Sequence, residues 1–261
     1  MAALELTGPG RAVVVLGASN VSRGLARLAA AVRARCDGPL DLFVAAGHGR
    51  GYGVSTRVWQ RRLPSILASG LWRALDRERI ERPLVVVTDV GNELLYGLGI
   101  SAVAGAVREA AHRLAARGGR LVVTGLPLAA IARVGPLRYG LLRALYVPGC
   151  RLELHDLTPA AQWLDEELQA IAADCGGTFL EQPGEWYGVD ALHVRRRLID
   201  TVWRRVCDAW GLPPATVPPR ASLSDWAALG SRSAEVRALG RMMRLTRQPV
   251  IDRGLFRVWM Y

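Results

Sequence analysis

The sequence contains no lysine. All 34 basic residues are arginine, and with 23 acidic residues they give a formal net charge of +11. A charge of this size suggests nucleic acid or a membrane surface as a partner. However, the chain carries no zinc-finger, helix-turn-helix or aromatic-basic module, so we expect no nucleic-acid partner. The bias towards arginine, alanine, glycine and leucine indicates the codon usage of a GC-rich bacterial genome.

Long apolar runs and cysteine pairs are also missing. The sequence contains no stretch of about 18 uninterrupted apolar residues, which is the length that a helix needs to cross a bilayer. The first ten residues do not form a basic start followed by an apolar run, so no secretory signal is expected. The four cysteines lie far apart, at Cys36, Cys150, Cys175 and Cys207. This spacing argues against a metal site and for free thiols in a reducing compartment. We therefore predict a cytoplasmic protein with no metal, no cofactor and no stable membrane insertion.

Short apolar runs alternate with longer segments of helical period. The runs typical of buried strands are at residues 12–16, 42–46, 84–88, 121–124 and 178–180. Such alternation predicts a three-layer α/β/α fold with a mostly parallel, five-stranded sheet. In this architecture the functional residues follow the carboxyl ends of the strands. Ser19, the glycine-rich segment 47–51 and Asn92 each follow a strand, so we expect them to meet at one edge.

The rest of the chain is expected to complete this domain and extend it. Residues 128–150 are predicted to cover the site, and a helix is expected from Val194 to Trp210. The segment 211–219 contains four prolines and is predicted to be a linker. We therefore expect an α/β domain over 1–211 and a Pro-rich arm with a helical extension over 212–261. The extension, with helical spacing at Val236, Leu239 and Met243, would pack on the domain or on a second copy.

Asp190 and His193 are the most informative pair of residues. A carboxylate three residues before a histidine can hold the imidazole in the orientation that a general base needs. Ser19, in a tight turn after the first strand, is the candidate nucleophile. The oxyanion of the reaction would need donors, and the backbone N–H groups of Ser19 and Gly49 and the amide of Asn92 are the candidates.

These residues occur in four ordered blocks that resemble the SGNH/GDSL hydrolase superfamily. The blocks are Gly17–Asn20, a glycine of segment 47–51, Val90–Glu93 and Asp190–His193, and the resemblance extends over residues 11–210. It implies a flavodoxin-like fold without metal or organic cofactor. It also implies hydrolysis of an ester, a thioester or an acetylated carbohydrate through an acyl-serine.

The blocks depart from the family pattern in three places. Ala18 stands where the family has an aspartate, so a polar contact beside the nucleophile is missing. The glycine of the third block stands directly before Asn92, and Glu93 replaces an aspartate. In the second block Gly47, Gly49 and Gly51 all could donate, and Gly49 is favoured. Gly47, His48, Trp186 and Tyr187 are predicted to line the pocket.

Other interpretations remain. Ser19 could simply cap a helix, and Asn92 could form a turn. Residues 17–24 also resemble the phosphate turn of short-chain dehydrogenases, but that family needs a Tyr-x-x-x-Lys pair, and here Tyr139 is followed by Arg143. A third alternative is a catalytically impaired protein of the same fold that acts as a binding or interaction module.

Overall fold

A seven-stranded sheet forms the centre of the protein, with the strand order β10-β11-β2-β1-β5-β6-β7. The computed structural model describes residues 11–58, 61–146, 150, 152–219, 221, 227, 229, 235–238 and 241–261. The strands are β1 (Arg11–Leu16), β2 (Leu40–Ala45), β5 (Leu84–Val87), β6 (Arg120–Thr124), β7 (Thr178–Leu180), β10 (Ile251–Asp252) and β11 (Phe256–Met260). All neighbours are parallel except β10 and β11.

The five predicted strands are all present and give the order of a flavodoxin-like sheet. Counted along the chain within this sheet, β2-β1-β5-β6-β7 is the order 2-1-3-4-5. A dinucleotide-binding sheet of order 3-2-1-4-5-6 would place its third strand beside its second. Here β11, the last strand, occupies that position. The α/β fold is therefore confirmed, and the topology differs from that of the dehydrogenase alternative.

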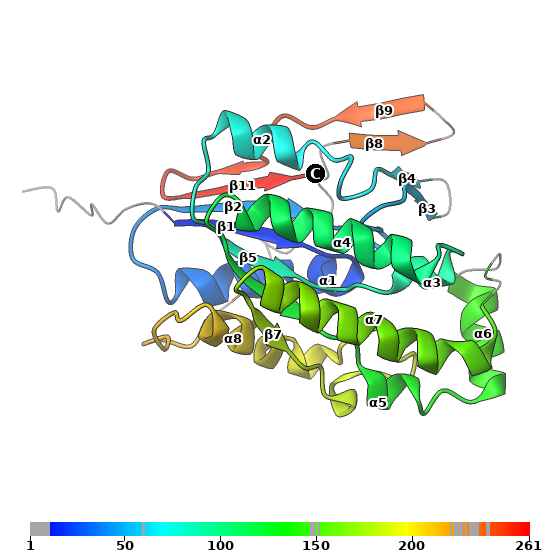
Figure 1. Ribbon diagram of the computed structural model, residues 1–261. Helices are drawn as coiled ribbons and strands as arrows, with labels where there is room; N and C mark the ends of the chain where they lie inside the picture. Colours follow the sequence, from blue (N-terminus) through cyan, green and yellow to red (C-terminus); the bar gives the residue numbers. More distant parts are fainter. Residues whose placement is uncertain are drawn as a thin grey trace, which may run out of the picture.

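Helices cover both faces of the sheet (Figure 1). Val13 and Val15 of β1 face one core, together with α1 (Ser19–Arg33) and α8 (Ile199–Ala209). The intervening Val14 and Leu16 face the other core, with α2 (Leu71–Arg77), α4 (Ile100–Ala115) and α7 (Leu154–Asp174). Because successive side chains of a strand point to opposite faces, an uninterrupted apolar run can fill both cores.

The C-terminal part of the chain differs from the sequence prediction. Its described elements are strands: β8 (Glu235–Ala238) and β9 (Arg241–Leu245) form a small antiparallel sheet with β3 (Thr56–Val58) and β4 (Arg61–Leu63). The predicted helical extension is wrong for Val236 in β8 and Met243 in β9, whereas Leu239 lies outside the described residues. Pairing with distant strands, which a local period cannot reveal, decides the structure here.

β11 adds to the main sheet in a register fixed by side chains as well as by the backbone. Arg257 lies opposite Asp41, and its guanidinium donates to both carboxylate oxygens, at 2.8 Å and 2.5 Å. Trp259 lies opposite Phe43, and the two rings stack with their centroids 4.4 Å apart. Figure 1 shows β11 alongside β2. The segment after residue 211 thus contributes two strands, β10 and β11, to the central sheet.

The remaining elements are short and lie near the carboxyl ends of the strands. They are α3 (Asn92–Leu95), α5 (Leu128–Ile131), α6 (Pro136–Tyr146) and the 3₁₀ turns Gly184–Trp186 and Arg196–Leu198. α8 begins at Ile199 and not at Val194 as predicted, because Val194 pairs with Tyr187 in a hairpin. Within the described part of the chain, no helix has the length and apolar character needed to cross a membrane.

Candidate active site

Ser19 is the first residue of α1, at the carboxyl end of β1. The helix start is held by Asp89, which follows β5: its Oδ2 accepts the N–H groups of Ala18, Asn20 and Val21, at 2.9, 2.8 and 3.1 Å. The N–H of Ser19 belongs to the first helical turn, where no intrahelical acceptor exists. Within the described residues it has no hydrogen-bond acceptor, so it is available to an anion at the positive end of the helix.

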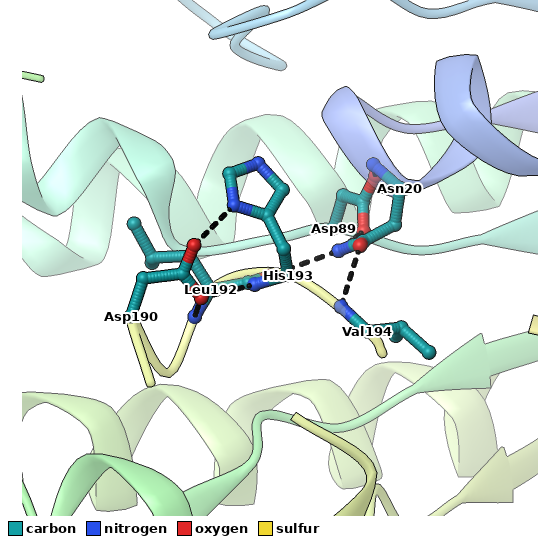
Figure 2. A network of polar contacts seen from close by, with 6 residues as sticks. All are labelled: Asn20, Asp89, Asp190, Leu192, His193 and Val194. Atoms are coloured by element: carbon teal, nitrogen blue, oxygen red, sulfur yellow. Dashed lines mark hydrogen bonds and ion pairs between the residues drawn. The ribbon is translucent and has the colours of Figure 1, made fainter. Parts of the chain in front are cut away.

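His193 lies in a tight hairpin with Asp190 at its turn. His193 Nδ1 lies 2.6 Å from Asp190 Oδ2, and the N–H groups of Leu192 and His193 donate to Asp190 Oδ1 at 3.1 and 3.0 Å (Figure 2). The hairpin is closed by Gly188 N–H, which donates to His193 O at 2.8 Å. Ala191 adopts a left-handed backbone conformation, with φ of 54°. One carboxylate therefore binds both the ring and the backbone of the histidine.

The charge of Asp190 sets the tautomer of this histidine. Burial acts to raise the pKa of Asp190, but the hydrogen bonds and charge of His193 and the Leu192 N–H outweigh it and lower the pKa to about 2. The group is thus ionised at neutral pH and accepts a hydrogen bond from the Nδ1–H group of His193. Nε2 is then the ring nitrogen that carries no proton, which is the state that a general base requires.

Asn92 begins the short helix α3, after the turn that follows β5. Gly91 precedes it with φ of 109°, a conformation that favours glycine. The next residue, Glu93, is only 1% exposed, and burial raises its pKa. Its Oε1 accepts the N–H groups of Tyr52 and Gly53, the latter at 3.0 Å. Glu93 thus ties the segment after β2 to the helix that carries Asn92.

The glycine-rich segment after β2 makes a turn closed by Arg50 N–H, which donates to Gly47 O at 3.1 Å. Gly49 lies in this turn with φ of 70°. Gly51 packs against Glu93 so closely that an added Cβ would lie 2.8 Å from its Cγ. The segment is therefore fixed by Glu93, but neither Gly47, His48 nor Gly49 lines the adjacent cavity.

A cavity of about 100 Å³ opens beside Ser19 at this edge of the sheet. Of the predicted site residues, Ser19, Asn92, Asp190 and Tyr187 line it. Trp186 does not, and its ring lies under the guanidinium of Arg205, at 5.1 Å. The side chain of His193 is also outside the lining set and is 22% exposed. The structure thus brings the serine, the asparagine and the aspartate to one cavity, with the histidine ring bonded to that aspartate.

Most of the side chains that line the cavity are apolar, and several of them come from the segment that was predicted to cover the site. The apolar lining residues are Val90, Leu94, Leu95, Leu126, Pro127, Ile131, Val134, Tyr139, Leu142, Cys150, Leu157 and Ala161, and Thr124 and Arg143 also line the cavity. Tyr139 is anchored by its hydroxyl, which donates to Leu152 O at 2.7 Å, and burial raises its pKa to about 12. The cavity therefore combines polar residues, among them Ser19, Asn92 and Asp190, with apolar side chains that are suited to an apolar group.

No family model and no curated protein matches this chain in sequence. Solved structures match it in fold. One crystal structure is 14% identical, with a TM-score of 0.53, and the match covers 77% of this chain and 97% of the other. Two further matches are TesA and a lipase/acylhydrolase from Enterococcus faecalis. TesA is 16% identical with a TM-score of 0.48, and covers 76% of this chain and 97% of its own. The lipase/acylhydrolase is 12% identical with a TM-score of 0.40, and the match covers 79% of this chain and 100% of the other.

The match with a TM-score of 0.53 supports the α/β fold of this chain, in agreement with the strand order of its central sheet. Ala18, which stands where the pattern that the sequence resembles has an aspartate, is completely buried. A carboxylate does lie beside Ser19, but it is supplied by Asp89, from the end of β5. Among the described residues, no group of three or more His, Cys, Asp or Glu side chains could hold a metal ion.

Three residues that support the site had no role assigned from the sequence. Asp89 and Asn20 connect the serine turn to the histidine hairpin. Tyr52 connects strand ends: its buried hydroxyl lies 2.8 Å from Thr88 O and 3.1 Å from Leu16 O, and it accepts the Thr88 N–H at 3.1 Å. Asp89 could have been found from its place directly after a predicted strand, at the same edge as Ser19. Tyr52 carried no such signal.

Proposed function

We propose that the protein is a serine hydrolase that cleaves an ester, a thioester or an O-acetyl group through an acyl-serine intermediate. In this proposal Ser19 is the nucleophile, His193 is the general base and Asp190 orients the base. The observation that carries it is the 2.6 Å contact between His193 Nδ1 and Asp190 Oδ2, in a hairpin beside a cavity that Ser19 lines. A triad is identified by such geometry and roles and not by sequence position.

The reaction would proceed in two steps, acylation of Ser19 and hydrolysis of the acyl-serine. Ser19 Oγ attacks the carbonyl carbon while its proton passes to His193 Nε2, and the carbonyl oxygen becomes an oxyanion. The N–H of Ser19, the amide of Asn92 and the N–H of Gly49 are the proposed donors to this oxyanion. His193 then returns the proton to the leaving group. A water molecule, deprotonated by the same histidine, then attacks the acyl carbon; the bond to Ser19 Oγ breaks, the acid leaves, and the histidine returns the proton to Ser19 Oγ.

The apolar wall of the cavity supports a substrate with an apolar acyl chain. Leu126, Leu142 and Ala161 are among the apolar residues that line the cavity. Burial of each methylene of an acyl chain contributes about 0.8 kcal/mol. Within the proposed range of substrates, esters and thioesters of longer acids are therefore favoured over acetylated carbohydrates.

The proposal is tested by labelling with a fluorophosphonate probe, which reacts with activated serines. We expect labelling of the wild type and of Ser22→Ala, and no labelling of Ser19→Ala or His193→Ala. Ser22 is a matched control, since it lies in the same helical turn and its hydroxyl donates to Ala18 O, at 3.1 Å. Equal labelling of Ser19→Ala would show that another residue is the nucleophile.

Turnover is tested separately with p-nitrophenyl esters of two to ten carbons. The wild type should hydrolyse them faster as the chain lengthens, until the cavity is filled. If the folded wild type neither takes the label nor hydrolyses any ester of the series, the enzyme proposal is refuted. A thermal shift with fatty acids in that case would favour the alternative of a binding module.

A further inference from the structure

The side chain of Asn20 uses all of its polar groups, and its partners lie far apart in the sequence. Its Nδ2 donates to Asp89 Oδ1 at 2.8 Å and to Leu192 O at 2.9 Å, and its Oδ1 accepts the Val194 N–H at 2.9 Å (Figure 2). These partners fix the orientation of the amide. If the amide were flipped, its NH₂ would face the Val194 N–H, and its oxygen would face the Leu192 carbonyl and the Asp89 carboxylate.

Two of the three partners are the residues on either side of His193. Asn20 binds the carbonyl group of Leu192 and the N–H group of Val194. Asp190 binds the imidazole ring and the backbone N–H group of His193. Figure 2 shows Asp190 and Asn20 on opposite sides of His193. Asn20 therefore restrains the main chain of the histidine, and Asp190 restrains its ring.

The third partner connects Asn20 to the serine. Asp89 accepts the side-chain N–H of Asn20 through one oxygen, and through the other it accepts the backbone N–H groups of Asn20 and of both Ala18 and Val21. Asn20 also follows Ser19 directly in the chain. A shift of the start of α1 relative to the histidine hairpin would therefore break several hydrogen bonds at once.

We propose that Asn20 is a positioning residue that fixes His193 relative to Ser19. This inference rests on the proposed function, in which the two side chains exchange a proton. Such an exchange is sensitive to distance, and a misplacement of 1 Å can lower a rate by about 10²-fold. Asn20 itself does not touch the reacting atoms; it acts through the backbone on both sides of the base.

Two substitutions and one control test this role. Asn20→Ala removes all three hydrogen bonds. Asn20→Asp keeps the shape and the acceptor for Val194, but it removes both donors and sets a second carboxylate against Asp89. Ser22→Ala is the control: it removes a hydrogen bond in the same helical turn, to Ala18 O, and leaves the hairpin untouched.

The first measurement is hydrolysis of p-nitrophenyl butyrate by the folded variants. We expect kcat to fall roughly 10²-fold in Asn20→Ala and at least as far in Asn20→Asp, with KM within about twofold of the wild type. Ser22→Ala should keep its kcat within about twofold. If Asn20→Ala does not fold, Asn20→Asp carries the comparison. A folded Asn20 variant with a wild-type kcat, or one whose loss lies in KM alone, would overturn the proposal.

The second measurement does not depend on hydrolysis, so it separates this inference from the proposed function. The ring signals of His193 are followed by NMR against pH, in the wild type and in both Asn20 variants. We expect the tautomer balance or the titration midpoint of His193 to change in the Asn20 variants and to be retained in Ser22→Ala. Unchanged His193 signals would overturn the role of Asn20 even if the wild type is active. A wild type without activity but with Asn20-dependent His193 signals would refute only the proposed function.

Discussion

Replacement of Asp190 by asparagine should lower stability by an amount that depends on pH. The carboxyl has a pKa of about 2 in the folded protein against an ordinary value of 3.8. Its side chain is 18% exposed, so solvent screens the interaction only in part. The difference between the two pKa values corresponds to about 2 kcal/mol of folding free energy at neutral pH.

The direction of the pH dependence follows from the lowered pKa. Because the folded protein holds the carboxyl in its charged form, the stabilisation is complete above the ordinary pKa of 3.8 and is lost as the pH falls through about 2. Asp190→Asn cannot ionise. Wild type and variant should therefore differ by about 2 kcal/mol at pH 7, and their stabilities should converge as the pH approaches 2.

The assay is urea unfolding of both proteins at pH 7, 5, 4 and 3. Asp156→Asn is the control, because Asp156 also contacts a histidine, His155, but both side chains are largely exposed. This substitution should change stability by less than about 1 kcal/mol. Under the proposed function, Asp190→Asn should also lower kcat by roughly 10³–10⁴-fold. A stability difference of the same size at pH 7 and pH 3 would refute the reasoning, since it would not come from the charge.

Three further predictions follow from the site. Asn92→Ala should lower kcat/KM by about 10²–10³-fold in steady-state ester hydrolysis while fluorophosphonate labelling persists, because one oxyanion donor of several is lost. Leu142→Trp should reduce hydrolysis of octanoyl esters relative to acetyl esters, because Leu142 is one of the apolar residues that line the cavity; an unchanged ratio would place the acyl chain elsewhere. Tyr52→Phe should lower the free energy of unfolding by about 0.5–1.5 kcal/mol in thermal or urea melts, because the hydrogen bonds of the buried hydroxyl to Thr88 O and Leu16 O are lost. A melt identical to that of the wild type would contradict this.

Much of the fold could be predicted because the buried strands are short, uninterrupted apolar runs. Leu84–Val87 and Arg120–Thr124 are bounded by proline, threonine or glycine residues, so their limits are clear. The strands of the small antiparallel sheet had no such pattern. In the pairing of β4 with β8, Arg62 lies opposite Arg237, and these residues are more than 170 positions apart in the sequence. A local periodicity cannot reveal a pairing between such distant segments.

The proposed catalytic and oxyanion-binding residues could be predicted from the sequence, whereas the residues that hold them in place could not. Ser19, Asn92 and Asp190 each follow a strand or occupy a turn that a sequence displays directly, and all three line one cavity. The connections that join them arise from the tertiary structure. Asn20 contacts residues 172 and 174 positions away, and an asparagine beside a serine carries no sign of such partners.

The outer strands protect the central sheet from other chains. β2 (Leu40–Ala45) is long and apolar, and without β11 it would expose a row of unpaired backbone groups. With β11 in place, the outermost strands are the two-residue β10 and the three-residue β7. Short edge strands are poor templates for pairing with a neighbouring molecule. Until residues 256–260 have been synthesised and have paired with β2, the nascent chain exposes β2 as an unpaired edge strand. Chains that end before β11 should therefore aggregate more during expression than the full chain.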